Sequence, residues 1–287
     1  MRRTLLSVSL AALVILIWPA SALAAVNPMP GSNTAGNFAV LSGAGLTNTG
    51  PSWVTGPIGA GAGITGFPPG TSGPKHNADG VYTTAETDLT AAYGAAVQPC
   101  TANYTGINLG GKTLKPGVYC QTTAPTLTGT LTLSGNGVYI FLIGTTAAPT
   151  TLVTASGSRV HLINGAQPCN VFWRVTSSAT IATSTTFVGT IMANASIQMQ
   201  TGATLNGRAL ARTAAVTLDT NRIIRPSGCG FTTPTYVPPP AGNVLPPNLG
   251  IPSELLGSFP WLLVVGIGAG VGAAALGVSA RRRRRTA

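Results

Sequence analysis

Few side chains in this sequence could do acid–base or metal chemistry, and they are scattered. The nearest to a cluster is formed by Lys75, His76 and Asp79 in the stretch GPKHNADG, which reads as a polar loop preceding a helix. The second histidine, His161, alternates with apolar neighbours as a strand residue does. Both histidines therefore have an ordinary structural interpretation.

The carboxylates do not form a predicted catalytic centre either. Glycoside cleavage needs two facing carboxylates, and solenoid lyases place several acids around calcium. The solenoid region offers only Asp79, Glu86, Asp88 and Asp219. Glu86 and Asp88 suit the first turn of a helix, and Asp219 stands alone. Because metal-ligand spacings, a G-x-S-x-G elbow, a P-loop and a dinucleotide fingerprint are also missing from the sequence, we expect no enzyme, no metal and no cofactor.

The four cysteines predict disulfides in an exported chain. Three pairings are possible, and we favour Cys100 with Cys120 and Cys169 with Cys229. The first disulfide would close a loop after the helix, and the second would join the two ends of the most regular part of the chain.

The net charge of the chain indicates its orientation in a membrane and not a nucleic-acid partner. The chain of 287 residues has a formal net charge of +11, but much of it comes from Arg2, Arg3 and the run 281–285. The middle has no basic run with interleaved aromatic residues, so we expect no nucleic acid. Charged residues are only 7% of the chain, and Thr, Ser, Gly and Ala replace them.

An eighteen-residue repeat between 170 and 225 organises the chain. Trp173, Ile191 and Ala209 follow one another at this step, as do Val175, Ala193 and Ala211, and Phe187, Leu205 and Ile223, with Gly189 and Gly207 also in phase. Short alternating runs lie between these positions and predict strands with one buried face. A repeat of this length is typical of one coil of a β-solenoid, in which each coil buries its inner face against the next.

A single helix is predicted outside the repeat. Thr83 and Glu86 form a capping box, and Leu89, Ala92, Tyr93, Ala96 and Val97 follow at helical spacing until Pro99. One apolar stripe predicts that the helix lies along the side of the solenoid. The apolar run 138–143 (VYIFLI) is expected to be a strand buried on both faces, between the helix and the coils.

Both ends of the chain predict export and anchoring. Residues 1–24 have the basic, apolar and small-x-small regions of a signal peptide. The segments that follow are an ectodomain at 25–231, a Pro-rich stalk at 232–260, an uncharged transmembrane helix at 261–280 and an Arg-rich tail at 281–287. The positive-inside rule puts the tail in the cytoplasm. We therefore predict a single-pass membrane protein of the bacterial cell surface, and the loose match of 245–250 (LPPNLG) to a sortase signal leaves cell-wall attachment as the alternative.

Several stretches resemble one known family. They are NFAVLSGAGLTNTG and VTGPIG within 37–59, LKPGVYC at 114–120, NVFWRV at 170–175, GTIMA at 189–193, NGRALAR at 206–212 and VTLDTN at 216–221. In this order the chain, over about residues 37–224, resembles the ice-binding-like family of secreted microbial antifreeze proteins. The resemblance implies a mainly β fold, a right-handed β-solenoid of triangular section with coils discontinuous in sequence and one long α-helix packed alongside; the apolar span adds a C-terminal transmembrane helix.

The resemblance also implies that one flat solenoid face binds an ice surface and slows crystal growth. Stacked strands repeat at about 4.8 Å, and a face of Thr, Ser and Ala presents methyls beside hydroxyls. Thr201-Gly202-Ala203-Thr204 fits a pattern found at the binding face of some relatives. The ice-binding residues predicted on this basis and from the repeat are Thr180, Ala182, Ser196, Gln198, Thr201, Thr204, Ala215 and Thr217.

An adhesin or structural protein that binds polysaccharide or other cells is the alternative. Exposed aromatic side chains would favour this alternative. The ectodomain contains two tryptophans, Trp53 and Trp173, and the repeat puts Trp173 in the core.

Overall fold

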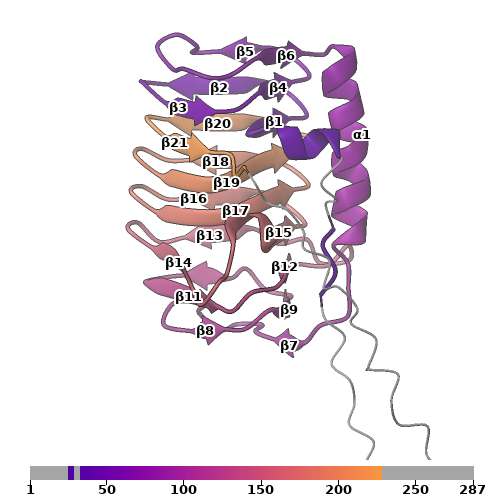
Figure 1. The fold of residues 1–287 in the computed structure, drawn as a ribbon, viewed down its shortest axis with the longest axis vertical. Helices are drawn as coiled ribbons and strands as arrows, with labels where there is room; N and C mark the ends of the chain where they lie inside the picture. Colours follow the sequence, from indigo (N-terminus) through magenta and orange to yellow (C-terminus); the bar gives the residue numbers. More distant parts are fainter. Residues whose placement is uncertain (1–24, 29–32, 228–287) are drawn as a thin grey trace, which may run out of the picture. The chain divides into compact units, whose positions relative to one another are not determined.

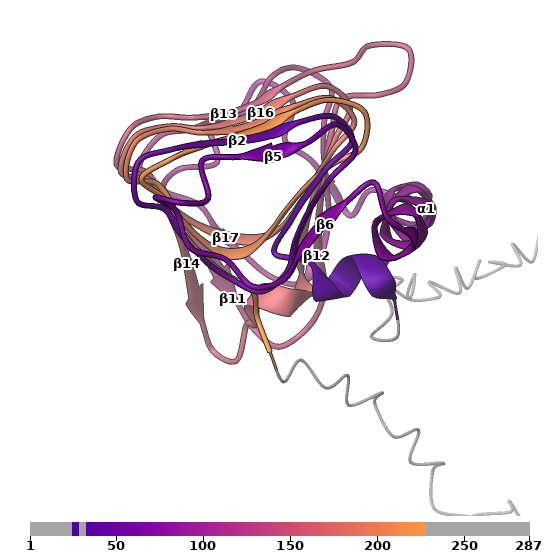
Figure 2. The same cartoon turned by 90° about the horizontal axis from the view of Figure 1, so that it is seen from above.

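Parallel strands stacked in coils form the described part of the protein. We analysed a computed structural model, which describes residues 25–28 and 33–227. Seen from above, the coils have a triangular outline, and a helix lies beside one of their sides (Figure 2). The described residues all belong to one compact unit, and the fold is mainly β, as the sequence predicts.

Two parallel sheets make up the coils. The larger, sheet A, has the order β6-β4-β1-β19-β17-β15-β12-β9-β7, with β11, β14, β8, β21 and β3 attached beside this path. Its strands are β1 (Val40–Ser42), β3 (Trp53–Thr55), β4 (Ile58–Ala60), β6 (Lys75–Asn77), β7 (Ala102–Asn103), β8 (Thr113–Leu114), β9 (Gly117–Gln121), β11 (Thr130–Ser134), β12 (Tyr139–Ile143), β14 (Arg159–Ile163), β15 (Val171–Val175), β17 (Thr186–Ala193), β19 (Thr204–Ala211) and β21 (Arg222–Ile224).

Sheet B forms one side of the triangle by itself. Its order is β10-β13-β16-β18-β20-β2-β5. Its strands are β2 (Leu46–Thr49), β5 (Ile64–Thr65), β10 (Thr126–Leu127), β13 (Leu152–Thr154), β16 (Ala179–Ile181), β18 (Ile197–Met199) and β20 (Val216–Asp219). Two short 3₁₀ helices, η1 (Thr34–Asn37) and η2 (Pro168–Asn170), precede β1 and β15.

The strand register confirms the eighteen-residue repeat. Trp173 pairs with Ile191, which pairs with Ala209 on the next strand. In the same way Leu205 connects Phe187 to Ile223. All six side chains are buried, so residues at equal steps in the sequence occupy equivalent positions in one continuous core.

The repeated glycines have a steric cause. Gly189 pairs with Gly207 of β19, and it lies between the start of β17, which pairs with β14, and the second half of β17, which pairs with β15. A β-carbon at Gly207 would lie 1.9 Å from the carbonyl oxygen of Gly189, and Gly189 itself has a φ of 108°. Stacked corners therefore require glycine at the same step in successive coils.

The stack is not in sequence order. Val40 of β1 pairs with Ala209 of β19, and Leu46 of β2 pairs with Val216 of β20. The N-terminal coils therefore extend the C-terminal coils, and the chain must then cross to the opposite end of the stack, where β7, β8 and β9 lie (Figure 1). Helix α1 (Gly80–Ala95) makes this crossing, and its 16 residues rise about 24 Å, or roughly five strand spacings.

Helix α1 begins earlier than the capping box predicts. Its N-cap is Asp79, whose carboxylate accepts a hydrogen bond of 2.8 Å from the backbone N–H of Tyr82. Thr83 therefore lies inside the first turn, and its hydroxyl bonds the carbonyl of Asp79. The predicted box between Thr83 and Glu86 is wrong, because an aspartate that precedes it satisfies the free backbone donors first.

The side of sheet A next to α1 has a second core. Leu89, Ala92 and Tyr93 of the helix pack with Phe172 and Met192 of the sheet. The predicted apolar stripe is confirmed for these helix positions, whereas Val97, which the prediction included, follows the helix and is 59% exposed. The helix thus covers an apolar sheet face that would otherwise meet water.

Strand β12 separates the two cores. Tyr139, Phe141 and Ile143 point into the coils, whereas Ile140 and Leu142 point to the helix. All five are buried, which confirms the prediction of a strand with two buried faces.

One predicted disulfide is present. Cys100 and Cys120 are bonded and join the segment after α1 to β9. Cys169 is buried in η2, but its predicted partner Cys229 lies outside the described residues, so that pairing stays a prediction.

The predicted membrane localisation needs correction. Within residues 25–28 and 33–227, no helix has the length and apolarity needed to cross a bilayer, and this finding overturns the single-pass assignment. The predicted signal peptide (1–24), stalk (232–260), transmembrane helix (261–280) and cytoplasmic tail (281–287) lie outside the described residues.

Candidate functional site

The outer face of sheet B carries a straight row of side chains, one from each strand. Successive register pairs join the seven positions: Thr126 to Val153, Val153 to Thr180, Thr180 to Gln198, Gln198 to Thr217, Thr217 to Thr47, and Thr47 to Thr65. We call these seven residues the sheet B row. Five of the seven are threonines, and none carries a charge.

Alternation within each strand keeps this row on the outside. In β18, Ile197 and Met199 are buried on either side of exposed Gln198. In β20, Val216 and Leu218 are buried on either side of exposed Thr217. The inner residues belong to the coil core, so the core fixes which way the outer residues point.

Small and polar residues border the row on both sides. On one side the hydroxyls of Ser178 and Ser196 are hydrogen-bonded at 2.9 Å, and Ala215, directly before β20, accepts a backbone hydrogen bond from Ile197 of the neighbouring coil. On the other side Thr49 is in register with Asp219, whose carboxylate accepts a hydrogen bond from the hydroxyl of Thr201.

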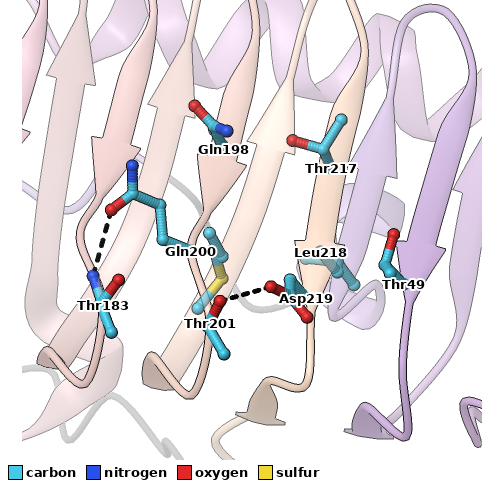
Figure 3. A pocket seen from close by; sticks show the side chains of 9 residues that line it. Thr49, Thr183, Gln198, Gln200, Thr201, Thr217, Leu218 and Asp219 are labelled. Atoms are coloured by element: carbon cyan, nitrogen blue, oxygen red, sulfur yellow. Dashed lines mark hydrogen bonds between the residues drawn. The ribbon is translucent and has the colours of Figure 1, made fainter.

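A shallow depression of about 430 Å³ crosses this border. Gln198 and Thr217 form its edge on the row. Gln200 and Thr201 follow β18, and Asp219 is the last residue of β20 (Figure 3). The amide oxygen of Gln200 accepts a hydrogen bond of 3.2 Å from the backbone N–H of Thr183. The polar groups at this edge are therefore held by bonds between coils.

The eight predicted ice-binding residues do not all lie together. Thr180, Gln198 and Thr217 are in the sheet B row, and Ser196 and Ala215 lie beside it. Thr201 is exposed in the turn after β18. These six share one face.

Ala182 and Thr204 depart from the predicted arrangement. Ala182 is only 7% exposed, because it follows β16 where the chain turns inward and its N–H bonds the hydroxyl of Thr154. Thr204 opens β19 in sheet A, in register with Thr186 and Arg222, on another side of the triangle. The pattern 201–204 therefore spans a corner, and its two threonines face different sides.

Four members of the row were missed by sequence reasoning. All four lie outside the regular repeat. Thr126 and Val153 are on β10 and β13, which precede it, whereas Thr47 and Thr65 are on β2 and β5, which stack out of sequence order. The alternation in Leu46-Thr47-Asn48-Thr49 indicates a strand, but the neighbour that joins it to the repeat is β20, where Thr217 pairs with Thr47. Only the tertiary fold brings these positions into the row.

The titratable groups at the start of α1 have structural partners. His76 and Asp79 are 2.8 Å apart, and the bond from Tyr82 followed by that from His76 holds the pKa of Asp79 below its usual value. Burial raises the pKa of Glu86 in α1 to about 7, while the hydrogen bond from Tyr82 and the charge of Arg212 act in the opposite direction. Within residues 25–28 and 33–227, no three His, Cys, Asp or Glu side chains are close enough to hold a metal ion.

The face combines hydrogen-bonding and apolar groups at a regular spacing. Its hydroxyls can donate and accept hydrogen bonds, its methyl groups are apolar, and the strand spacing repeats these groups every 4.8 Å or so. A row held by a packed core needs no ordering before it meets a second ordered lattice.

Comparison with known proteins gives a consistent group of matches. Residues 40–224 match the family described as ice-binding-like. An ice-binding protein of a Nostoc strain is 41% identical over 235 residues, covering 77% of this chain and 84% of its own. An ice-binding protein of Flammulina populicola is 35% identical over 222 residues, covering 68% and 87%. The crystal structure of an ice-binding protein from the Antarctic ascomycete Antarctomyces psychrotrophicus is 40% identical, with a TM-score of 0.64 over 68% of this chain and 97% of that one.

Proposed function

The chain belongs to the ice-binding-like family, and we propose that it binds ice through the outer face of sheet B and slows crystal growth or recrystallisation. The observation that carries the proposal is the sheet B row, in which seven uncharged side chains from seven strands share one register. No catalytic step is part of the proposal.

The contact would be formed by the row and its border. Thr47, Thr126, Thr180 and Thr217 supply hydroxyls and methyls, and Val153, 42% exposed, supplies methyl groups alone. Ser196, Ala215 and Thr201 widen the face on its two sides. An ice lattice is a rigid array of hydrogen-bonding water, so a rigid array of small groups meets it with little loss of conformational entropy.

Growth of a single ice crystal in a solution of the purified protein tests the proposal. We expect faceted crystals and a gap between the melting and freezing temperatures. Thr217→Tyr places a bulky ring in the middle of the row and should reduce the gap strongly. Thr186→Tyr is the matched control, because Thr186 is also an exposed strand threonine but lies on a different side of the triangle.

Two outcomes would contradict the proposal. Round ice crystals in the presence of the wild-type protein would show that the protein does not bind ice. The second outcome is that Thr217→Tyr and Thr186→Tyr reduce the gap between melting and freezing of ice equally, while both variants unfold at the wild-type temperature. This result would show that sheet B is not the contact face.

A further inference from the structure

The remaining side of the triangle carries a second row of side chains, which the proposed ice contact does not use. It is formed by β3, β21, β14, β11 and the first halves of β17 and β19 (Figures 1 and 2). Register pairs join its positions in the order Thr130, Arg159, Thr186, Thr204, Arg222 and Trp53. We call these six residues the arginine row.

An exposed tryptophan ends the arginine row. Trp53 is 56% exposed, whereas Trp173 is fully buried. The guanidinium of Arg222 lies 5.5 Å from the centre of the Trp53 ring, so a planar cation and an aromatic face stand side by side at the surface. A large exposed indole costs solvation free energy unless a ligand covers it.

The cations of this row have no carboxylate partners in the described part of the chain. The salt bridge found there joins His76 to Asp79, and neither Arg159 nor Arg222 takes part in it. The carboxylate nearest to Arg222 along the chain is that of Asp219, which is engaged by the hydroxyls of Thr201 and Thr220. Both guanidiniums are therefore available to an external anion.

We propose that the arginine row binds an acidic polysaccharide. One sugar ring would stack on Trp53, and carboxylates along the chain would accept hydrogen bonds from Arg222 and Arg159. The two arginines are three strand spacings apart, about 14 Å, so one extended polymer reaches both and a single sugar acid does not.

The observations favour a polysaccharide over a single-stranded nucleic acid. Nucleic-acid grooves combine a dense basic track with several aromatic platforms for successive bases. The arginine row has two cations and one aromatic side chain. The Cys100–Cys120 disulfide also indicates an oxidising compartment outside the cytoplasm, where acidic glycans are abundant ligands.

Binding of the purified protein to polygalacturonate tests the proposal, with dextran as the neutral glycan and poly(dT) as the nucleic acid. Isothermal titration at low salt should show binding to polygalacturonate and none to dextran. Added salt should weaken it, because screened charges attract less. Arg222→Gln, Arg159→Gln and Trp53→Ala should each weaken binding about ten-fold or more.

Lys115→Gln is the control variant, because it removes one exposed positive charge that is not in the row. Ice shaping by all four variants should match the wild type, which separates this proposal from the ice contact on sheet B. Absence of wild-type binding, equal weakening by Lys115→Gln, or tighter binding of poly(dT) than of polygalacturonate would each overturn it. If Arg222→Gln lowers the melting temperature of the protein, Arg222→Lys would replace it. Lysine keeps the positive charge but cannot make the bidentate hydrogen bonds of arginine to a carboxylate, so binding should still weaken.

Discussion

The indole of Trp173 lies flat on the ring of Phe141, with centroids 3.9 Å apart and planes 10° from parallel. The two residues are register partners on β15 and β12. Phe141 in turn stacks on Tyr119 of β9, and Trp173 contacts Phe187 of β17. The aromatic side chains thus form a column inside the coils that continues from one coil to the next.

Truncating the tryptophan at the centre of this column should reduce the stability of the protein strongly. Trp173 is fully buried, and its indole N–H donates a 2.9 Å hydrogen bond to the carbonyl of Val188. Trp173→Ala should therefore lower the free energy of unfolding by about 3–5 kcal/mol, measured by denaturant unfolding. Trp53→Ala, at the exposed tryptophan, should change it by less than about 1 kcal/mol. Equal losses would contradict the assignment of Trp173 to the core.

The corner glycines give a second prediction. A β-carbon at Gly207 would overlap the carbonyl of Gly189, so Gly207→Ala should destabilise by about 1–3 kcal/mol or more. Gly94→Ala is the opposite case, since Gly94 lies in α1 and a β-carbon there meets nothing within 4 Å. It should stabilise by about 0.5–1 kcal/mol. Melting curves of the two variants should move in opposite directions.

The sheet B row contains one position that interrupts its array of small groups. Gln198 stands between Thr180 and Thr217, where a longer side chain departs from the spacing of its neighbours. Gln198→Thr should extend the threonine array and widen the gap between melting and freezing temperatures. Asn206→Thr makes a similar change at an exposed position of β19 on the arginine-row side and should leave the gap as it is. A gap that narrows in Gln198→Thr would show that the glutamine takes part in the contact.

Glu86 gives a pH dependence of stability. Its folded-state pKa of about 7 lies above the ordinary value of 4.5, because burial disfavours the charged carboxylate. Below pH 4.5 the carboxyl of Glu86 is neutral in both the folded and the unfolded chain, so its ionisation does not change the free energy of unfolding. Between pH 4.5 and 7 the unfolded chain loses the proton first, so stability falls as the pH rises, and above pH 7 the loss is constant.

Comparison with Glu86→Gln isolates this effect. The variant should melt above the wild type at pH 8, and the difference should shrink towards zero at pH 4. Taking the difference removes the contribution of Asp79, whose depressed pKa acts in the opposite sense. A difference that grows as the pH falls would reverse the assigned sign and contradict the burial of a neutral Glu86.

The locally repeating parts of this fold can be predicted from the residue pattern alone. The step from Trp173 to Ile191 to Ala209 fixes the coil length, because side chains at equal steps must share one core. The alternation in β18 and β20 fixes which residues face out. The spacing of Leu89, Ala92 and Tyr93 fixes the buried side of the helix. Each of these depends on contacts made within a strand, a helix or one repeat.

Features that depend on contacts between distant segments could not be predicted from local patterns. The pairing of Leu46 with Val216 brings Thr47 into the row of Thr217, although 170 residues separate the two threonines. The pairing of β2 with β20 depends on how whole coils pack on each other and on the helix that connects the two ends of the stack. No local sequence pattern predicts such a pairing. The same fit buries Ala182 and turns Thr204 to another side, because a bend at a corner reverses the direction that alternation assigns.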